Sequence, residues 1–428
     1  MKREKEDFKG DLDRHVSAVR DEYVTFFQNL LRIPTPRMQE HDAMHFVADA
    51  IRAAAWDVEV FAGRGEGEPT PDGVPINLLA RRRGSGGGRS LLLEAHMDTV
   101  PPGDPSRWTH GPWSGHIDSG RIFGRGAHDD RGGVVAVCML AEVLRRLNPE
   151  ICGNVYLLIT TEEEFSCGGM KAFLDHPSCV VPDAHVLVDG NRDVNTCILG
   201  HPGAISFEVL LPGAWGSAQL VDKVCETNPI ELASLLICEL SDHETAMREL
   251  QKKSAQGDPW PPAIVAVTEI AGGQWLANIP EECLLRGWGN VYPPLTLGQY
   301  KQCFEERVRT FAQRHAWLRE HPPMVHWGPL EVEAMRTPES SELYRMLAEA
   351  HEESFAVPLS GRLIGGWGDM TLLGSPNQLF YGPGRGGGDH TYDEFYELAD
   401  LSGVVKTLGQ LVRSWCGDAR PRPHCSDE

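Results

Sequence analysis

The sequence predicts an α/β protein with a mostly parallel, doubly wound sheet that is interrupted by an inserted α+β domain. In the first 197 residues, short apolar segments that suit buried strands alternate with longer segments whose apolar side chains recur at helical spacing. That alternation is typical of a parallel sheet with helices on both faces. From about residue 198 the order becomes β-α-β-β-α, and the first pattern returns near Met324. We therefore expect one domain from residues 1–197 and 321–428, and an inserted domain from residues 198–320.

Each element follows from its local pattern. Amphipathic spacing predicts helices at residues 13–32, 40–55, 134–147, 168–174, 228–253, 297–319, 338–354 and 394–415. Short apolar or alternating segments predict strands at residues 57–62, 77–80, 90–95, 154–160, 184–188, 203–211, 263–273, 282–291, 325–334, 363–369 and 378–382.

Composition and charge restrict the function. The chain of 428 residues has room for a large core and two domains. Its net charge of -21, with no basic cluster longer than Arg81-Arg82-Arg83, argues against nucleic-acid binding. No apolar stretch is long enough to cross a membrane, and the charged start lacks the apolar core of a signal peptide. The eleven cysteines include no CxxC pair, so we expect reduced thiols in a cytoplasmic protein.

Histidine and acidic residues follow several of the predicted strands. They are His96 and Asp98, Glu163 and Glu164, Asp189, and His390 on a glycine-rich loop. In a doubly wound sheet the functional crevice lies at the carboxyl ends of the strands. Carboxylates that crowd together there need a counter-charge, and a divalent metal ion supplies one.

An acidic turn precedes the predicted helix at 134–147. Residues 124–130 read GRGAHDD and run directly into Gly132-Gly133. An Asp before a helix is most often an N-cap, and the turn taken alone favours that interpretation. The acidic and histidine clusters at the other strand ends favour a functional site instead.

Five motifs, in this order and spacing, resemble one enzyme family. They are HMDTV, GRGAHDDRGG, TTEEEFSCGG, LVDG and GPGRGGGDHTYDE. The family is the co-catalytic metallopeptidases and amidohydrolases that include aminoacylase, carnosinase, acetylornithine deacetylase, succinyl-diaminopimelate desuccinylase and glutamate carboxypeptidase, with a nitroanthranilate aminohydrolase as an unusual branch. The resemblance covers nearly the whole chain, since NPIELASLL and IAGGQWLANIPEEC are similar to segments of the family's inserted domain. It implies a catalytic domain interrupted by a dimerisation or lid domain.

The resemblance implies a role for each motif residue. One or two divalent ions (Zn, Mn or Co) would be held by His96, Asp129, Glu164, Asp189 and His390, with Asp129 bridging the two positions. Asp98 would hold the imidazole of His96, a supporting role that tunes such ligands. Glu163 would be the general base that takes a proton from water and returns it to the leaving nitrogen.

The implied activity is hydrolysis of a C–N bond in a small-molecule substrate, and in most relatives that bond is an amide. One alternative is an aminohydrolase that releases ammonia from an aromatic amine such as a nitroanthranilate. Another is a non-catalytic, metal-binding oligomer. The presence of Glu163 argues against that last alternative, because a structural metal site needs no general base.

Three positions depart from the family pattern for binding a substrate carboxylate. Thr371 stands where an Arg is usual, Asn290-Val291 stands where a second Arg is usual, and residues 215–217 lack the usual His. We therefore expect poor activity on N-acyl amino acids and dipeptides, because an Arg–carboxylate pair dominates that specificity. Trp215, Trp288 and Trp367 fall at or near these positions and favour a flat aromatic substrate.

Four other residues are candidates for substrate binding: Arg385, Arg362, Asn278 and Trp367. The two arginines are considered because a guanidinium suits anions, although either can simply be solvated. The inserted domain predicts an antiparallel sheet whose edge strand can pair with a copy of itself. We therefore expect a homodimer or a larger even homo-oligomer.

Overall fold

The structure is a computed structural model and describes residues 2–65, 74–219, 224–254 and 260–417. The chain divides into two compact units. The first contains residues 1–199, 336–362 and 368–428, and the second contains Gly200–Met335 and Leu363–Trp367. The chain passes between the units within three strands, β8 (Thr196–His201), β15 (Met335–Arg336) and β16 (Ser360–Leu363), and again between Trp367 and Gly368.

A mixed sheet forms the centre of the first unit, in the order β1-β2-β6-β3-β7-β17-β8-β15, with β16 beside β8. Its other strands are β1 (Asp57–Ala62), β2 (Ile76–Arg82), β3 (Leu91–His96), β6 (Val155–Thr160), β7 (Ala184–Leu187), β16 (Ser360–Leu363) and β17 (Gln378–Phe380). The middle strands β6, β3, β7 and β17 are parallel, whereas β1, β2 and β8 are antiparallel to their neighbours. The carboxyl ends of the four parallel strands therefore meet at one edge of the sheet.

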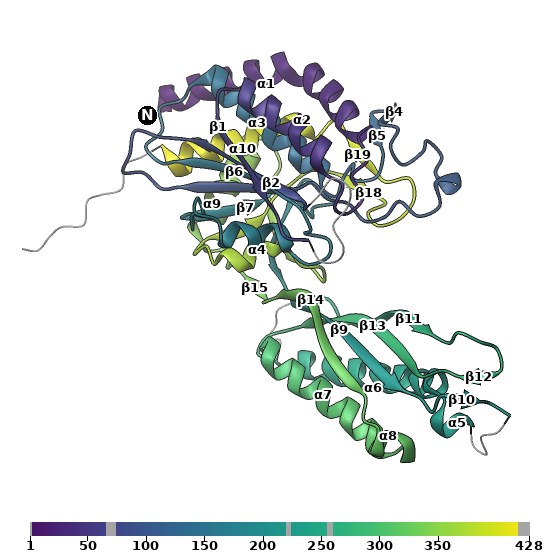
Figure 1. Cartoon of the computed structure of the whole chain (residues 1–428). Coiled ribbons are helices and arrows are strands. Elements are labelled where there is room, and N and C mark those ends of the chain that lie inside the picture. Colours follow the sequence, from purple (N-terminus) through teal and green to yellow (C-terminus); the bar gives the residue numbers. More distant parts are fainter. Residues whose placement is uncertain (1, 66–73, 220–223, 255–259, 418–428) are drawn as a thin grey trace, which may run out of the picture. The chain divides into compact units, whose positions relative to one another are not determined.

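Helices cover both faces of this sheet, as the sequence predicted (Figure 1). They are α1 (Lys2–Leu31), α2 (His41–Ala53), α3 (Arg131–Leu147), α4 (Gly168–Leu174), α9 (Glu342–Phe355) and α10 (Leu401–Cys416), with short 3₁₀ turns η1 (Pro105–Arg107) and η2 (Asp369–Leu373). On β3, Leu91, Leu93 and Ala95 pack into the large core with α1, α2, α3 and α10. Leu92 faces the opposite way and packs with Met170 of α4. Because side chains alternate along a strand, His96 shares the α4 face with Leu92.

A second, smaller sheet of the first unit differs from the sequence prediction. It has the order β18-β19-β5-β4, formed by β4 (His116–Asp118), β5 (Arg121–Phe123), β18 (Gly386–Gly387) and β19 (Phe395–Glu397). The helix predicted at residues 394–415 begins only at Leu401, so its first seven residues were predicted wrongly. The reason is tertiary, because residues 395–397 pair with β5, far away in the sequence.

The second unit is an antiparallel sheet packed against helices (Figure 1). The sheet has the order β11-β13-β9-β14, from β9 (Gly203–Pro212), β11 (Val265–Gly272), β13 (Glu282–Val291) and β14 (Met324–Val332), and β10 (Gly216–Ser217) pairs with β12 (Asn278–Ile279). The helices are α5 (Val224–Thr227), α6 (Pro229–Ser254), α7 (Leu297–Gln313) and α8 (Ala316–Glu320). Phe207, Leu236 and Phe304 lie in the core between sheet and helices.

The second unit extends past residue 320, the end that the sequence predicts for the inserted domain, and continues to Met335. The strand β14 pairs with β9, so residues 324–332 complete the inserted sheet and do not return to the first unit. An apolar strand pattern does not reveal which sheet the strand joins, and that is why the boundary differs. No helix in the described ranges is long and apolar enough to span a membrane.

Candidate metal centre

The predicted ligands gather at the carboxyl ends of the parallel strands. His96 ends β3, Glu163 and Glu164 follow β6, and Asp189 follows β7. Asp129 joins them from the turn that precedes α3. Two groups of side chains there could hold a metal ion, and within each group the ligand atoms lie within 4.8 Å of one another.

The first group consists of His96, Asp129 and Asp189. The Nε2 atom of His96 lies 3.0 Å from Oδ1 of Asp129 and 3.9 Å from Oδ2 of Asp189. The side chain of His96 is fully buried. A nitrogen and carboxylate oxygens are a donor set that suits zinc, manganese or cobalt.

The second group consists of Asp129, Glu164 and His390. The Nε2 atom of His390 lies 3.2 Å from Oδ2 of Asp129 and 3.0 Å from Oε2 of Glu164. The two groups share Asp129, which presents one carboxylate oxygen to each. His390 is the outermost member, because 53% of its side chain is exposed.

Glu163 lies beside the first group. Its Oε2 atom is 4.0 Å from Nε2 of His96, and its side chain is almost wholly buried. Burial raises the pKa of Glu163 well above its ordinary value, even though the nearby His96 lowers it. A raised pKa makes a carboxylate a stronger base toward water than an ordinary glutamate is.

Asp98 contacts residues at the ends of two strands, β3 and β6. Its two carboxylate oxygens accept hydrogen bonds from the backbone N–H groups of Glu163 and Glu164, each at 3.2 Å. The Nδ1 atom of His96 lies 3.1 Å from the backbone oxygen of Asp98 and 3.5 Å from its carboxylate. Asp98 therefore holds the glutamate turn as well as the imidazole, and the sequence indicated only the second contact.

The turn before α3 contains both the expected cap and the expected ligand. Asp130 is the N-cap, and it accepts hydrogen bonds from the N–H groups of Gly133 and His96, each at 3.1 Å. Its neighbour Asp129 is left to face the two histidines. The cap is therefore Asp130, and the residue predicted as a metal ligand is its neighbour Asp129.

Glu394 is a supporting residue that sequence reasoning missed. It is fully buried, and its carboxylate accepts hydrogen bonds from the side chain of Arg125 and from the N–H groups of Gly126, His128 and Asp129. These contacts fix the backbone that carries Asp129. The only signal in the sequence was its position four residues after His390, at the end of the last motif.

The carboxylates of the two groups strongly affect each other's ionisation. Burial, followed by the charge of Asp129, raises the pKa values of Glu164 and Asp189 to about 7. Hydrogen bonds to Asp129 and Glu164 raise the pKa of His390 to about 11. Burial raises the pKa of Asp129, but the hydrogen bonds from His390 and His96 outweigh it and lower that pKa. The crowded negative charge thus draws positive charge to the site, as protons or as a cation.

The predicted substrate-binding residues are divided between the two units. Arg385 donates two hydrogen bonds to Asp400, at 2.9 and 2.7 Å, and Arg362 donates one to the backbone oxygen of Gly190, at 3.2 Å. Both arginines belong to the first unit. The other two candidates belong to the second unit: Asn278 lies in β12, and Trp367 packs edge to face with Trp288, with ring centroids 5.2 Å apart.

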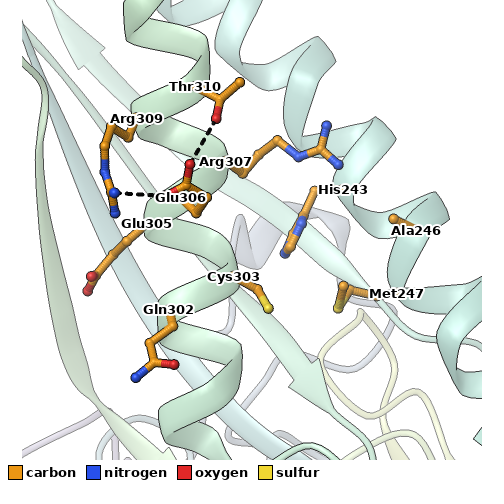
Figure 2. A pocket seen from close by; sticks show the side chains of 10 residues that line it. All are labelled: His243, Ala246, Met247, Gln302, Cys303, Glu305, Glu306, Arg307, Arg309 and Thr310. Atoms are coloured by element: carbon orange, nitrogen blue, oxygen red, sulfur yellow. Dashed lines mark hydrogen bonds and ion pairs between the residues drawn. The ribbon is translucent and has the colours of Figure 1, made fainter.

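A cavity of about 650 Å³ lies between α6 and α7 in the second unit (Figure 2). It is lined by His243, Ala246, Met247, Gln302, Cys303, Glu305, Glu306, Arg307, Arg309 and Thr310. Figure 2 shows the imidazole of His243 between the two helices, with Glu306 bonded to Arg309 and Thr310. None of the predicted site residues lines this cavity.

The chain belongs to Peptidase family M20/M25/M40, which it matches over residues 92–414. It is 24% identical to N-formyl-4-amino-5-aminomethyl-2-methylpyrimidine deformylase of Halalkalibacterium halodurans, over 95% of this chain and 97% of that one. It is 34% identical to succinyl-diaminopimelate desuccinylase of Methylorubrum populi, over 51% of this chain and 57% of that one.

Solved structures agree on the fold. A di-peptidase from Saccharomyces cerevisiae superposes with a TM-score of 0.78 and 14% identity, covering 96% of this chain and 99% of that chain. A dinuclear metal-binding peptidase of family M20 from Bacillus subtilis gives 0.63 and 15%, covering 94% and 99%. The protein is therefore a hydrolase of a family whose named relatives act on C–N bonds.

Proposed function

We propose that this protein is an amidohydrolase that removes a small acyl group from an N-acylated, flat heteroaromatic amine, with the help of two divalent ions. The observation that carries this proposal is the pair of ligand groups that share Asp129, with Glu163 beside them. A metal-dependent hydrolase needs this combination of ligands and a base.

The ligand groups fit a divalent ion chemically. All their donor atoms are imidazole nitrogen or carboxylate oxygen. Oδ1 of Asp189 and Oε1 of Glu164 are buried and have no hydrogen-bond partner among the described residues, which is costly unless a cation or water meets them. We infer that zinc, manganese or cobalt occupies both groups.

Each residue then has a defined task. Ions held in this way supply Lewis acidity, which makes water a nucleophile at neutral pH and polarises a carbonyl group. Glu163 accepts the proton that the attacking water loses and returns it to the leaving nitrogen. Asp98 keeps Glu163 and Glu164 in register through their N–H groups. Asp129 holds the two groups at a fixed separation.

Three observations support the substrate class, each of them within one unit or one comparison. Thr371 is neutral, and Arg385 is already paired with Asp400, so an amino-acid carboxylate gains little from either. The half-buried pair Trp288 and Trp367 gives the second unit an aromatic surface that suits a flat ring. The relative that aligns over most of both chains is named for the deformylation of a pyrimidine.

A competitive substrate panel tests this proposal. With Mn, Zn or Co present, the panel contains N-formylated and N-acetylated aminopyrimidines, N-acetyl amino acids, dipeptides and substituted 2-aminobenzoates. We expect free amine and carboxylate from the acylated heteroaromatic amines, at the highest kcat/KM. Preferred turnover of N-acetyl amino acids or dipeptides would contradict the substrate class. Ammonia from the 2-aminobenzoates alone would replace it with an aminohydrolase.

We further propose that the protein assembles as a homodimer through the second unit. The strand β11 is at the end of its sheet, and Ile270, Trp275 and Leu276 near it are exposed. An open edge with apolar side chains is a pairing surface for another strand. Light scattering at micromolar concentration is expected to give twice the chain mass, and the variant Ile270→Glu is expected to be monomeric. A monomeric wild type would contradict this assembly.

A further inference from the structure

We propose that Arg37 is a positioning residue that braces the turn carrying Glu163 and Glu164, and so controls both the rate and the metal affinity without touching the substrate. This inference rests on the proposed function, because it takes Glu163 as the base and Glu164 as a ligand. Arg37 lies on the segment after α1, and sequence reasoning gave it no role.

Arg37 contacts the turn on both sides of the two functional residues. Its Nη2 atom lies 2.7 Å from Oε2 of Glu162, whose side chain is fully buried. Its guanidinium carbon lies 3.8 Å from the centre of the Phe165 ring, a cation–π contact. Glu163 and Glu164 are the residues between these two contacts.

The turn needs such a brace because its backbone is strained. Glu162 has φ of +64°, in the left-handed region that a side chain such as Glu rarely adopts. Backbone strain of this kind persists only where surrounding contacts hold it, and it concentrates at functional sites. Within the turn, Ser166 donates from its N–H to the backbone oxygen of Glu162 at 3.1 Å and from its hydroxyl to the carboxylate at 3.3 Å.

The segment that carries Arg37 is itself fixed to the end of β3. The hydroxyl of Thr35 donates to the backbone oxygen of Met97 at 3.1 Å. The hydroxyl of Thr99 donates to the backbone oxygen of Thr35 at 3.0 Å. Pro36 forms a parallel bridge with Thr99. Arg37 therefore links two ligand-bearing strand ends, because Met97 lies between His96 and Asp98, and Glu162 precedes Glu163.

Removing Arg37 leaves the buried carboxylate of Glu162 without its cation. A buried charge that loses its partner is strongly unfavourable, so the turn is expected to rearrange. The carboxylate of Asp98 still accepts hydrogen bonds from the N–H groups of Glu163 and Glu164. The contacts of Arg37 with Glu162 and Phe165 are lost. Supporting partners of this kind change metal affinity or activity by about 10- to 100-fold when they are lost.

The test compares Arg37→Met and Arg37→Lys with a matched control. Arg81 forms a similar ion pair, with Nη2 2.6 Å from Oε2 of Glu59, between β1 and β2. Full-length variants are assayed for kcat and KM separately, and apo protein is titrated with Co(II) while its visible absorption is recorded. We expect Arg37→Met to lower kcat by about 10- to 100-fold with little change in KM, to weaken Co(II) binding and to change the spectrum. Arg37→Lys recovers part of each loss, and Arg81→Met changes none of them.

A double-mutant cycle with Glu162→Gln completes the test. Once Glu162 is neutral, the further change Arg37→Met is expected to cost much less, because no buried charge is left unpaired. Independent effects of the two changes, or a kcat and spectrum in Arg37→Met equal to the wild type, would overturn the brace. An inactive, metal-free wild type would instead contradict the proposed function, so the two failures are distinguishable. If Arg37→Met does not fold, Arg37→Lys and Glu162→Gln decide between the same outcomes.

Discussion

The two ligand groups share Asp129 but differ in how the protein holds them. The group of His96, Asp129 and Asp189 begins on a strand whose residues are all buried. The group of Asp129, Glu164 and His390 is completed from a loop, where His390 has φ of +59° and an exposed side chain. One group is therefore built into the sheet, and the other is closed by a residue that water reaches.

On the proposed two-ion arrangement, this difference predicts that the two positions bind ions with different strength. Buried ligands with several supporting hydrogen bonds are pre-organised, which favours tight binding. An exposed ligand on a loop gains less, because it must be ordered and because water competes with it. We expect a tightly held ion in the buried group and an exchangeable ion in the exposed one.

The largest effect is expected from the residue that the two groups share. Asp129→Ala removes one ligand from each group and is expected to abolish binding of both ions and to reduce activity to the uncatalysed background. The Lewis acidity that the ions supply is worth several kcal/mol, so the loss is roughly 10³-fold or more. Elemental analysis after dialysis checks the metal, and Asp118→Ala, on the exposed strand β4, is the control. Retention of both ions would show that Asp129 is not the bridge.

The glutamate turn separates base from ligand. Glu163→Gln keeps the shape but cannot accept a proton, so it is expected to retain both ions and to lose roughly 10²- to 10⁴-fold in kcat. Glu164→Gln is expected to weaken the ion of the exposed group. Measurements of kcat and metal content on the two variants check this assignment. Exchanged outcomes would mean that the assignment along the turn is shifted by one residue.

The two histidines test the difference between the groups. His390→Ala is expected to lower the affinity for one ion about 10- to 100-fold while the other ion stays bound, and His96→Ala is expected to affect the tightly held ion. In a time course with a chelator, wild-type protein is expected to release one ion before the other. Simultaneous release of both ions would remove the distinction between the buried and the exposed group.

The smallest effect is a dependence of metal binding on pH. In the metal-free protein, hydrogen bonds to Asp129 and Glu164 raise the pKa of His390 to about 11, so its imidazole is protonated at neutral pH. The stabilisation by this charge is therefore present at neutral pH and is lost as the pH rises through that value. A metal ion must displace the proton, so its affinity is expected to rise up to about tenfold per pH unit for each proton released. Calorimetry in two buffers of different ionisation enthalpy measures the release, and affinity that falls with rising pH would contradict it.

The sequence predicted the elements that carry the ligands because their signals are local. The buried strands before His96, Glu163 and Asp189 are short apolar segments, and the parallel order of β6, β3 and β7 brings their ends together. It did not predict contacts between distant segments. Because β19 pairs with β5, the last helix begins later than predicted. Because β14 pairs with β9, residues 324–332 belong to the second unit.

The supporting residues Glu394 and Arg37 could not be predicted from the sequence either, because their contacts also join distant segments. Glu394 holds the Asp129 turn from about 265 residues away in the chain, and Arg37 reaches Glu162 across about 125 residues. Neither residue has a local pattern that separates it from ordinary surface charge. Their roles follow from burial and hydrogen bonds, which only the folded chain reveals.

We propose that Asp129 lies between two divalent ions, one in each ligand group. Crystals grown with zinc, with diffraction data collected on both sides of the zinc absorption edge, test it most directly. We expect two anomalous peaks, one among His96, Asp129 and Asp189 and one among Asp129, Glu164 and His390, with the second weaker after a brief soak in chelator. Peaks at other residues, or no peak at the strand ends, would contradict the assignment of the metal centre.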